Sequence, residues 1–542
     1  MAENDPGPLE DPADLRAPRR GRARPVLAVA ALIPLAAAVG AVTVSPAPET
    51  VPVTRAETQS QPGASTLRCP GPMQVPEDLF TEGADDELAL SPPSETIGLS
   101  SMALETDSSL LFGTVSGSET LQEADGSARA PSLTTLGADG STLEDAAATS
   151  KLGAGVQVLP GVEEAASVRA ATAEGSRPVA DAVQSSTTTS GDFRSLALTR
   201  CEEPTTDASF LGVSTDTGDS SALVLRNPTQ RPATASVQIW TEDGPAPMEG
   251  RSQVVVAPGT EERVLLESVA GGQDAVGVRA SVLGAPLAMH VQTTERNGLT
   301  PGGAEVLQPL PPASLEQVLP GVEATGTSPT VVLANPQGAD TTASIEVTGA
   351  DGPVDDASLE DVEIPAGAVV PVPLESVTEG TYSVAVRSQD PVLAVARSTA
   401  AGEDLPGDTV GTPVDFALTS PAPALSTSGL LALPQEGGVG ALTLAATDDA
   451  SVTVVPIGSD GTAGSPVEAD LAAGTSSVIP WQELAIDGTR TRAVTVVPSV
   501  PGAVHAGWMQ RESDGSGGDL ISSLPVPSAQ LSTDALTVRL QD

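Results

Sequence analysis

The side chains that could carry out chemistry are few in this chain of 542 residues, which contains two cysteines, two histidines and one tyrosine. Histidine catalysis needs a nucleophile within reach and an acid that orients the ring. His290 and His505 each follow a proline by four residues, and Val395 occupies the corresponding place in another copy of the same sequence pattern. A position that accepts valine is typical of a strand face. We therefore predict packing or partial exposure for both histidines and no catalytic residue.

Three other patterns contain some, but not all, of the residues that a catalytic or binding site would require. GDSS at 218–221 and SDGSGG at 513–518 resemble serine-protease loops, but no His–Asp pair accompanies them. GGVGAL at 437–442 lacks the strand–helix context of a phosphate loop. The acidic runs Asp85–Glu87 and Asp355–Glu363 could bind Ca²⁺, yet neither has the spacing of a calcium loop. Solvated acidic loops are the favoured interpretation, and we expect no metal and no cofactor.

Cys69 and Cys201 are the only cysteines, and they lie near the two ends of one candidate domain. In an exported chain, two such cysteines favour a disulfide. Closing a loop of roughly 130 residues would stabilise the fold by up to about 5 kcal/mol in the chain-entropy model. Two free thiols are the alternative, whereas a zinc or redox site would need more ligands or a CxxC motif. We predict a Cys69–Cys201 disulfide.

Composition limits the class of protein. The formal net charge is −46, and such an acidic surface repels nucleic acid and anionic lipid. Binding of calcium or a cationic polymer is the alternative use of this charge. The 49 prolines and 53 glycines make long helices unexpected outside a membrane span. A chain of this length also exceeds what one hydrophobic core supports. We expect several small β domains and no nucleic-acid partner.

The N-terminal region predicts export. Residues 1–24 are polar and end in an arginine cluster, and 26–44 carry no charge. Nineteen helical residues span about 28 Å, close to the hydrocarbon core of a bilayer. Arginines before a span keep the N-terminus cytoplasmic. We predict a disordered cytoplasmic segment (1–24), a transmembrane signal-anchor (25–44) and a Pro/Thr/Ser-rich stalk (45–66), with the remainder outside the cell membrane. A cleaved signal peptide and secretion are the alternative.

The rest of the chain is built from repeats. LVLRNP (223–228) recurs as VVLANP (331–336), and each copy continues through a DGP turn, a Pro/Gly turn, a Leu-Glu-Ser-Val segment and a closing hairpin. A degraded third copy follows, and SVRAATAEGSRPVADAVQSSTT (167–188) resembles the closing hairpin. Six or seven short strands per copy predict immunoglobulin-like or fibronectin-like β-sandwiches. We expect a disulfide-closed β domain at 67–206 and sandwich repeats at 207–312, 313–425 and 426–542.

Inside the first domain, short apolar runs predict strands at 97–104, 110–115, 156–159, 179–183 and 196–198. Residues 124–150 are weaker and indicate a long loop. Trp240, Trp481 and Trp508 lie in strand or turn segments, for which burial in a core is the default. A sugar-binding tryptophan exposed in a groove is the alternative.

These strand and turn residues resemble the DUF5719 family of actinobacterial proteins. The matching pieces are CPGP after the N-terminal span, the lone Cys201, the L-x-L-x-N-P strand (223–228), the DGP and APG turns (243–245, 257–259) and GLTPGGAEVLQP (298–309). SFLGVST, before the first strand, departs from the aromatic or Gly-Gly residues usual in the family. The resemblance implies an exported, envelope-associated β protein, and neighbouring membrane glycosyltransferases connect the family with envelope polymers.

Taken together, the sequence predicts a non-enzymatic, membrane-anchored extracytoplasmic scaffold or interaction module. Its expected partners are the membrane, through the N-terminal helix, and an envelope protein or polysaccharide. A carbohydrate-binding accessory to a glycosyltransferase is the second hypothesis, and a secreted hydrolase is the third.

Overall fold

The computed structural model describes residues 58–60, 63–74, 92–115, 128–146, 149–150, 152–172, 177–248, 250, 252–404, 411–434, 439–516, 518–529 and 536–538. These residues form strands joined by turns and three short 3₁₀ helices, with no α-helix among them. The chain divides into a main body, Gln61–Ala535, and a smaller unit of Met1–Ser60 with Leu536–Asp542. The all-β prediction is therefore confirmed over the described residues.

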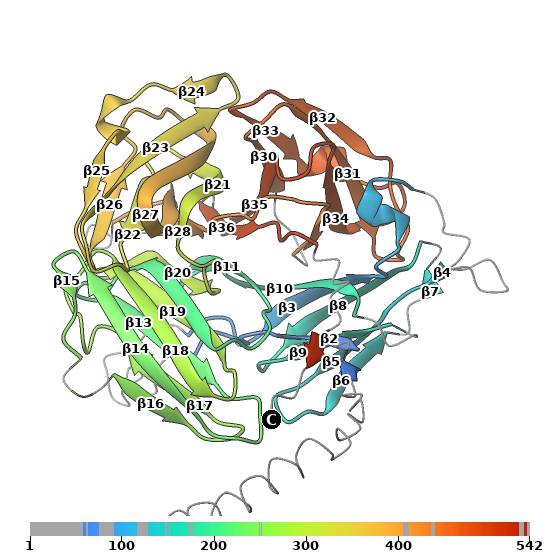
Figure 1. Cartoon of the computed structure of the whole chain (residues 1–542), viewed down its shortest axis with the longest axis horizontal. Coiled ribbons are helices and arrows are strands. Elements are labelled where there is room, and N and C mark those ends of the chain that lie inside the picture. Colours follow the sequence, from blue (N-terminus) through green and yellow to red (C-terminus); the bar gives the residue numbers. More distant parts are fainter. Residues whose placement is uncertain are drawn as a thin grey trace, which may run out of the picture. The chain divides into compact units, whose positions relative to one another are not determined.

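The main body contains four β-sandwiches, here called units 1 to 4, each with eight principal strand positions, two of which are occupied in unit 3 by one long strand (Figure 1). The strands of unit 1 are β2 (Ala64–Arg68), β3 (Ile97–Leu104), β5 (Ser132–Leu136), β6 (Thr142–Ala146), β8 (Ala154–Val162), β9 (Ser167–Ala171), β10 (Val179–Thr188) and β11 (Ser195–Arg200). Those of unit 2 are β12 (Asp207–Val213), β13 (Ser220–Arg226), β14 (Ala233–Thr241), β16 (Gln253–Val256), β17 (Glu261–Leu265), β18 (Val276–Gly284), β19 (Ala288–Asn297) and β20 (Thr300–Leu307).

Units 3 and 4 repeat the plan. Unit 3 has β21 (Ser314–Ala324), β22 (Thr330–Ala334), β23 (Thr341–Gly349), β25 (Val362–Ile364), β26 (Val369–Pro373), β27 (Gly380–Ala401) and β28 (Val414–Thr419). Unit 4 has β29 (Gly429–Ala432), β30 (Val439–Ala446), β31 (Ala450–Gly458), β32 (Val467–Leu471), β33 (Thr475–Pro480), β34 (Thr491–Pro498), β35 (Val504–Ser513) and β36 (Asp519–Pro525). Further short strands are β4 (Ala128–Arg129), β7 (Thr149–Ser150), β15 (Gly244–Pro245) and β24 (Gly352–Val354).

Every unit has the same strand order. One sheet contains the first, sixth, third and fourth strands, as in β12–β18–β14–β16. The other contains the fifth, second, seventh and eighth, as in β17–β13–β19–β20. The immunoglobulin constant domain instead places strands ABED in one sheet and CFG in the other. The likeness to immunoglobulin or fibronectin domains thus stops at the two-sheet architecture, and the count of strands is higher than the six or seven expected.

The segment expected to be a closing hairpin is not one. In unit 2, β18 pairs with β12 and β14, whereas β19 pairs with β13 and β20 in the opposite sheet. In unit 3 one unbroken strand, β27, serves both sheets and passes Pro391 between them. Proline lacks the N–H that a hairpin ladder needs. The proline of this segment therefore marks the point at which the chain crosses from one sheet to the other.

The Asn-Pro signal has the same structural role in two units. Asn227 is fully buried, and its amide donates to the carbonyls of Arg231 (2.7 Å) and Val256 (3.1 Å). Asn335 donates to Ala339 (2.8 Å) and Ile364 (3.1 Å) in the same way. A buried amide with these partners supplies the hydrogen bonds that the broken ladder loses.

Two local expectations in unit 1 are wrong. Residues 109–112 form a 3₁₀ helix (η2, Ser109–Phe112) that ends at Gly113 in the left-handed region, where a strand was expected at 110–115. Its leucines face a core, so burial and not β-structure explains the apolar run. Residues 124–150, expected to be a loop, contain the antiparallel pair β5–β6. Leu133 is the main apolar anchor there, which is why the segment looks weak.

The four units contact one another in closed cyclic order and do not form an open string. The eighth strands meet at the centre: β11 packs on β20, β20 on β28, β28 on β36 and β36 on β11 (Figure 1). A separate apolar cluster lies at each junction between neighbours. The junction of units 2 and 3 contains Leu211, Trp240, Ala275, Val332, Ala334, Val369, Leu393, Val395, Phe416 and Leu418. The others are smaller at units 1 and 2 and at units 3 and 4, and extensive at units 4 and 1.

An arginine–carboxylate pair also spans each junction. The pairs are Arg194–Asp514 (2.8 Å, units 1 and 4), Arg296–Asp192 (2.8 Å, units 2 and 1), Arg397–Glu295 (2.6 Å, units 3 and 2) and Arg511–Glu323 (2.6 Å, units 4 and 3). Each arginine therefore reaches the preceding unit around the ring. The Arg397–Glu295 pair is bidentate, and a buried or half-buried pair of this kind adds geometric specificity to an apolar contact.

The membrane-related predictions lie mostly outside the described residues. Segments 1–24 and 25–44 are in that class, and no helix of the described residues could cross a membrane. Within the predicted stalk, β1 (Thr58–Ser60) pairs with β37 (Leu536–Val538), and β2 begins at Ala64. Residues 536–538, which the prediction places in the third sandwich repeat (426–542), belong to the smaller unit.

Candidate functional site

Cys69 and Cys201 form a disulfide, as expected from an exported chain with two cysteines. Cys69 directly follows β2, and Cys201 directly follows β11. Both sulfur-bearing side chains are buried in the core of unit 1. The bond joins the first and last strands of the unit and so closes it covalently.

The two histidines do not occupy equivalent positions. Pairing on the second strand matches His290 with Val224, Val395 with Val332 and Gly507 with Thr443. His505 pairs two residues further along, opposite Ala445. The expected equivalence of His290 with Val395 agrees with this register, whereas that of His505 is wrong, because the crossing at Pro501 is longer by two residues than the one at Pro286.

Neither histidine has the surroundings of a general base. Burial, together with Arg263 and Arg226, lowers the pKa of His290 to about 3. Burial also lowers the pKa of His505, although its Nδ1 lies 2.8 Å from the carbonyl oxygen of Ala422. Both histidines are therefore held in the neutral form.

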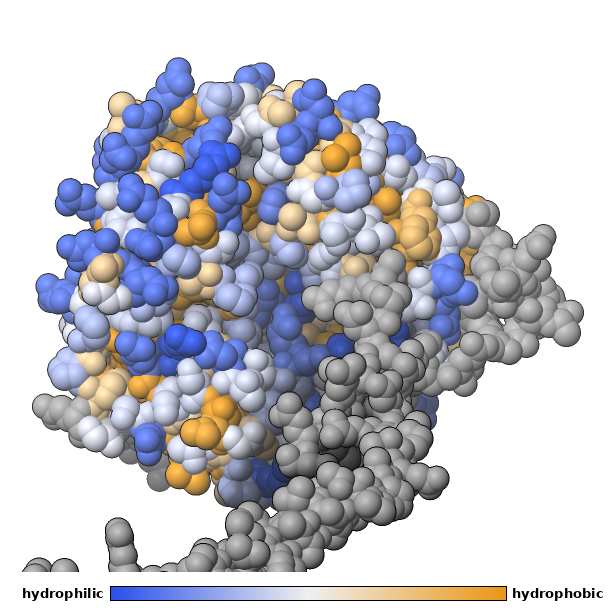
Figure 2. Space-filling view, viewed as in Figure 1, coloured by the Kyte–Doolittle hydropathy of each residue, from blue (hydrophilic) through white to orange (hydrophobic). Residues whose placement is uncertain are grey.

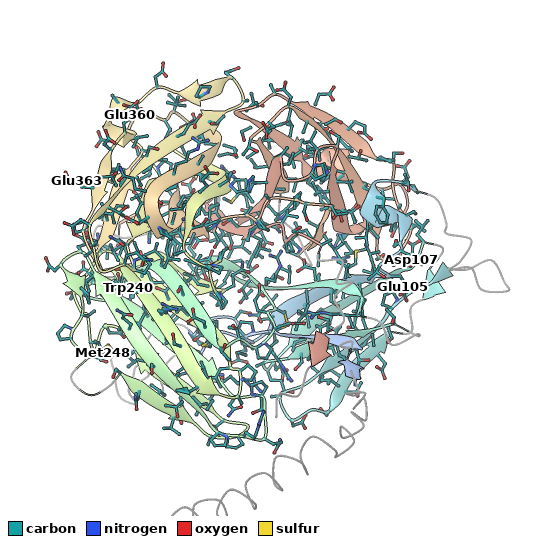
Figure 3. All side chains as sticks on the ribbon, in the orientation of Figure 1. Glu105, Asp107, Trp240, Met248, Glu360 and Glu363 are labelled. Atoms are coloured by element: carbon teal, nitrogen blue, oxygen red, sulfur yellow. A yellow bond between two sulfur atoms is a disulfide. The ribbon has the colours of Figure 1, made fainter. Side chains whose placement is uncertain are left out.

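Two of the three tryptophans are core residues. Trp240 is 1% exposed and lies at the junction of units 2 and 3, as Figure 3 shows from its label between those sheets. Trp508 is 2% exposed, and its indole N–H donates to Gln510. Trp481, at the start of the 3₁₀ helix η5 (Trp481–Leu484), is half-buried against the core of unit 4. It is therefore the one tryptophan with surface to offer a sugar.

The acidic loop of unit 3 has a structural role at one position. Asp356 accepts hydrogen bonds from the backbone and hydroxyl of Ser358 and from Ser376, and these lower its pKa. Glu360 and Glu363 lie exposed at the edge of the unit (Figure 3). Within the described residues no group of three or more acids, histidines or cysteines could hold a metal ion, and Asp85–Glu87 lie outside them.

The centre of the ring is polar and closed. Asp415 on β28 is fully buried, and its Oδ2 accepts N–H bonds from Leu196 of unit 1 (3.0 Å) and Ile521 of unit 4 (2.9 Å). Unit 2 approaches through Gly303, where a Cβ would lie 2.8 Å from Asp415 Oδ1. One carboxyl group thus touches all four units. Burial raises its pKa to about 7, despite those N–H bonds and Arg194.

A second polar chain crosses the same centre. The Leu198 N–H donates to Ser522 Oγ (3.0 Å), and the Ser522 hydroxyl donates to Glu305 Oε1 (2.7 Å). Burial raises the pKa of Glu305 well above its usual range, and the Asp415 carboxyl adds to the rise. Ser522 and Glu305 therefore connect units 1, 4 and 2 by hydrogen bonds and help to close the ring.

A pocket opens beside the disulfide, at the junction of units 1 and 2. Its volume is about 30 Å³, which is room for one water or the head of a larger molecule. The charged and polar lining comes from the ends of four strands and includes Arg68, Arg200, Glu202, Arg226 and His290. Sequence reasoning missed this site, because its residues are distant in sequence and belong to two different units.

Three buried nitrogen atoms in this pocket lining have no hydrogen-bond partner among the described residues. They are Nε of Arg68, one terminal nitrogen of Arg200 and Nε2 of His290. His290 is only 7% exposed. The rest of each arginine is held in place: Arg68 donates to Ser167, and Arg200 bonds Asp181 (2.7 Å) and the Pro525 carbonyl (2.8 Å). These three nitrogens are closed off from solvent, so the pocket is bordered by fixed arginine and histidine side chains.

The charges around the pocket are unevenly neutralised. Arg226 has no hydrogen-bond or ion-pair partner among the described residues, and after burial itself it helps to lower the pKa of Arg68. Burial raises the pKa of Glu202 to about 7, with Arg200 opposing the rise and Asp181 and Glu203 adding to it. Glu203 is already bonded to Ser65 (2.8 Å) and Arg177. The guanidinium groups of Arg68 and Arg226 thus line the pocket together with Glu202, an acid that is easily protonated.

Fold and pocket together define a disulfide-bonded ring of four β-sandwiches with a donor-lined pocket at one junction. A family model described as "Family of unknown function (DUF5719)" matches residues 160–482, which is more than half of the chain. The chain belongs to the DUF5719 family.

No curated protein matches the chain. Among solved structures, it is similar to a biofilm associated protein (BSP domain) over 89% of this chain and 99% of the other, at 10% identity and a TM-score of 0.12. A likeness of this size relates neither the folds nor the functions.

Proposed function

We propose that the chain is a non-enzymatic scaffold or interaction module of the cell envelope, anchored by residues 25–44 with its bulk on the extracytoplasmic side. The closed ring supports this most directly. Its centre is crossed by hydrogen-bonded side chains and backbone and leaves only a small cavity, so a partner protein or a polymer meets the rim, the outer sheets or the junction pocket.

The surface fits a soluble extracytoplasmic body. Figure 2 shows hydrophilic side chains over much of the visible face, with apolar residues scattered between them. Such a surface, with a net charge of −46, favours solubility and selects against nucleic acid and anionic lipid. The disulfide supports an oxidising compartment. A partner protein or envelope polysaccharide is the expected ligand.

Tagging the C-terminus of the full chain in its own host tests the location. We expect the tag to fractionate with the membrane, to be removed by protease added to intact cells, and to be lost from the surface when 25–44 is deleted. A tag that is protected in intact cells and removed only after lysis contradicts the proposal. Affinity capture of the anchored protein then identifies its partner.

A carbohydrate-binding accessory to an envelope glycosyltransferase is the second candidate, favoured only by the half-buried Trp481. Stacking of a sugar on an aromatic ring requires an exposed face. Isothermal titration with envelope polysaccharide should give binding that Trp481→Ala removes, and equal binding by the variant would contradict this role.

A further inference from the structure

We propose that the pocket at the junction of units 1 and 2 binds a carboxylate group, held by Arg68, Arg226 and His290. This proposal is independent of where the protein resides. It rests on a built pocket and on the nitrogen atoms that line it.

The unpartnered atoms specify the ligand's chemistry. Arginine has donors and no acceptor, so Nε of Arg68 and the free nitrogen of Arg200 need an acceptor. Neutral His290 adds a third donor when its proton is on Nε2. These three nitrogens are closed off from solvent, so the group that a ligand can reach is the Arg226 guanidinium, which lines the pocket without a partner among the described residues, and an anionic ligand offsets its charge.

Size and neighbouring charge select a monoanion. A volume of about 30 Å³ admits a planar carboxylate head more readily than a tetrahedral dianion. Guanidinium groups also match the two oxygens of a carboxylate in a fork. Glu202 and Glu203 line the same pocket, and they penalise a second negative charge. Sulfate, which carries two charges at every working pH, therefore fits less well than a carboxylate.

The other units supply a natural comparison. Where unit 2 has Arg226 and His290, unit 3 has Ala334 and Val395 at the same register, and unit 4 has Ala445 and Gly507. The donors are therefore not required for the sandwich to fold. Units 3 and 4 lack these donors, and the pocket lies at a junction of the unit that has them.

Glu202 couples binding to pH. The groups facing it are Arg68, Arg200, Asp181 and Glu203, with Arg226 and His290 across the pocket. Above neutral pH its carboxylate repels a bound anion, and below it the neutral acid does not. Carboxylate binding should therefore be tighter at pH 6 than at pH 8.

The test is isothermal titration of the full-length protein with sodium acetate and sodium glucuronate at constant ionic strength and pH 6. We expect both probes to bind when the carboxylate alone is recognised, and glucuronate alone to bind when the sugar of a uronate also contributes. The double variant Arg226→Ala/His290→Val should lose at least tenfold in affinity, since it carries the residues of unit 3. Arg387→Ala, which removes an exposed arginine in unit 3 paired with Glu346, should bind like the wild type.

Two results would overturn the proposal: unchanged carboxylate binding by the double variant, or absence of binding by either carboxylate. Equal heats from phosphate and chloride would also overturn it, because they indicate non-specific charge pairing. Thermal unfolding of the double variant, measured in parallel, establishes that lost binding is not lost folding.

Discussion

Two junctions of the ring use the same strands for opposite purposes. Between units 2 and 3, Val395 on β27 packs with Trp240 and Phe416, and the Arg397 guanidinium lies 4.1 Å from the Phe416 ring centroid. Between units 1 and 2, the equivalent residue is His290, and it lines a pocket with unpartnered donors. One register position can therefore seal a junction or open it to a ligand. The side chain at this position makes the difference, because the two units share the same strand order.

Removing the Cys69–Cys201 disulfide, which lies beside the junction of units 1 and 2, should have the largest effect on stability. Cys69→Ser/Cys201→Ser frees a loop closed across 132 residues, which lowers the free energy of unfolding by up to about 5 kcal/mol. Urea unfolding with and without reductant measures it. If the wild type in reductant keeps its full stability, the disulfide is not needed for the stability of the fold. Hydrogen exchange should accelerate first in β2 and β11, next to the missing bond.

Truncation at the apolar junction comes second. Trp240→Ala should lower the free energy of unfolding by about 3–5 kcal/mol, because it leaves a cavity between two units. Trp481→Ala, at a half-buried position, is the matched control and should cost much less. Equal losses in the two variants, measured by chemical denaturation, would show that the junction contributes little to stability.

Moving the polar residue to the apolar junction tests the comparison directly. Val395→His buries an imidazole among apolar side chains, which should cost about 1–3 kcal/mol and more from overpacking. Denaturant midpoints compare it with the wild type. A variant of unchanged stability would mean that this position does not set the character of the junction.

The ring centre should respond to pH. The pKa of Asp415 is about 7 in the fold and lower when unfolded, so the native state binds the extra proton. Its contribution to stability is present at pH 4 and is lost as the pH rises through 7. Asp415→Asn cannot ionise, so its stability relative to the wild type should improve between pH 5 and pH 8. A constant difference across that range would contradict the shift.

The smallest effect is expected from making the polar junction resemble the apolar one. His290→Val removes a buried, unpartnered nitrogen and replaces it with the residue of unit 3. Stability should rise or stay within about 1 kcal/mol. A loss of more than 2 kcal/mol by the same denaturation assay would mean that His290 is a structural residue.

Sequence patterns predicted the strands where local alternation is strong. Residues 97–104 form β3 with those bounds, and the Asn-Pro, DGP and Pro/Gly signals end strands as expected. Apolar composition could not separate a buried 3₁₀ helix from a strand at 110–115, because both bury leucine. It also could not show that strands on either side of a proline enter different sheets, since pairing partners are distant in the chain.

The pocket and the ring closure were harder to predict for the same reason. GLTPGGAEVLQP was recognised as a motif, yet its role as the eighth strand depends on contact with units 1 and 3. The roles of Asp415 and Gly303 could not be predicted from the neighbouring sequence, because both residues act where two units approach each other closely. Arg68 and His290 are 222 positions apart by their numbers and meet only after the ring has closed.

Closure also restricts how the protein can evolve. An open solenoid tolerates the gain or loss of a repeat, because each repeat touches only its neighbours. In this ring the last eighth strand, β36, packs on the first, β11, so an added or deleted copy would break contacts at two places. Gene duplication could build the four copies, but copy number was then fixed. The copies accordingly differ by substitution at a shared register position, which residues 290, 395 and 507 occupy.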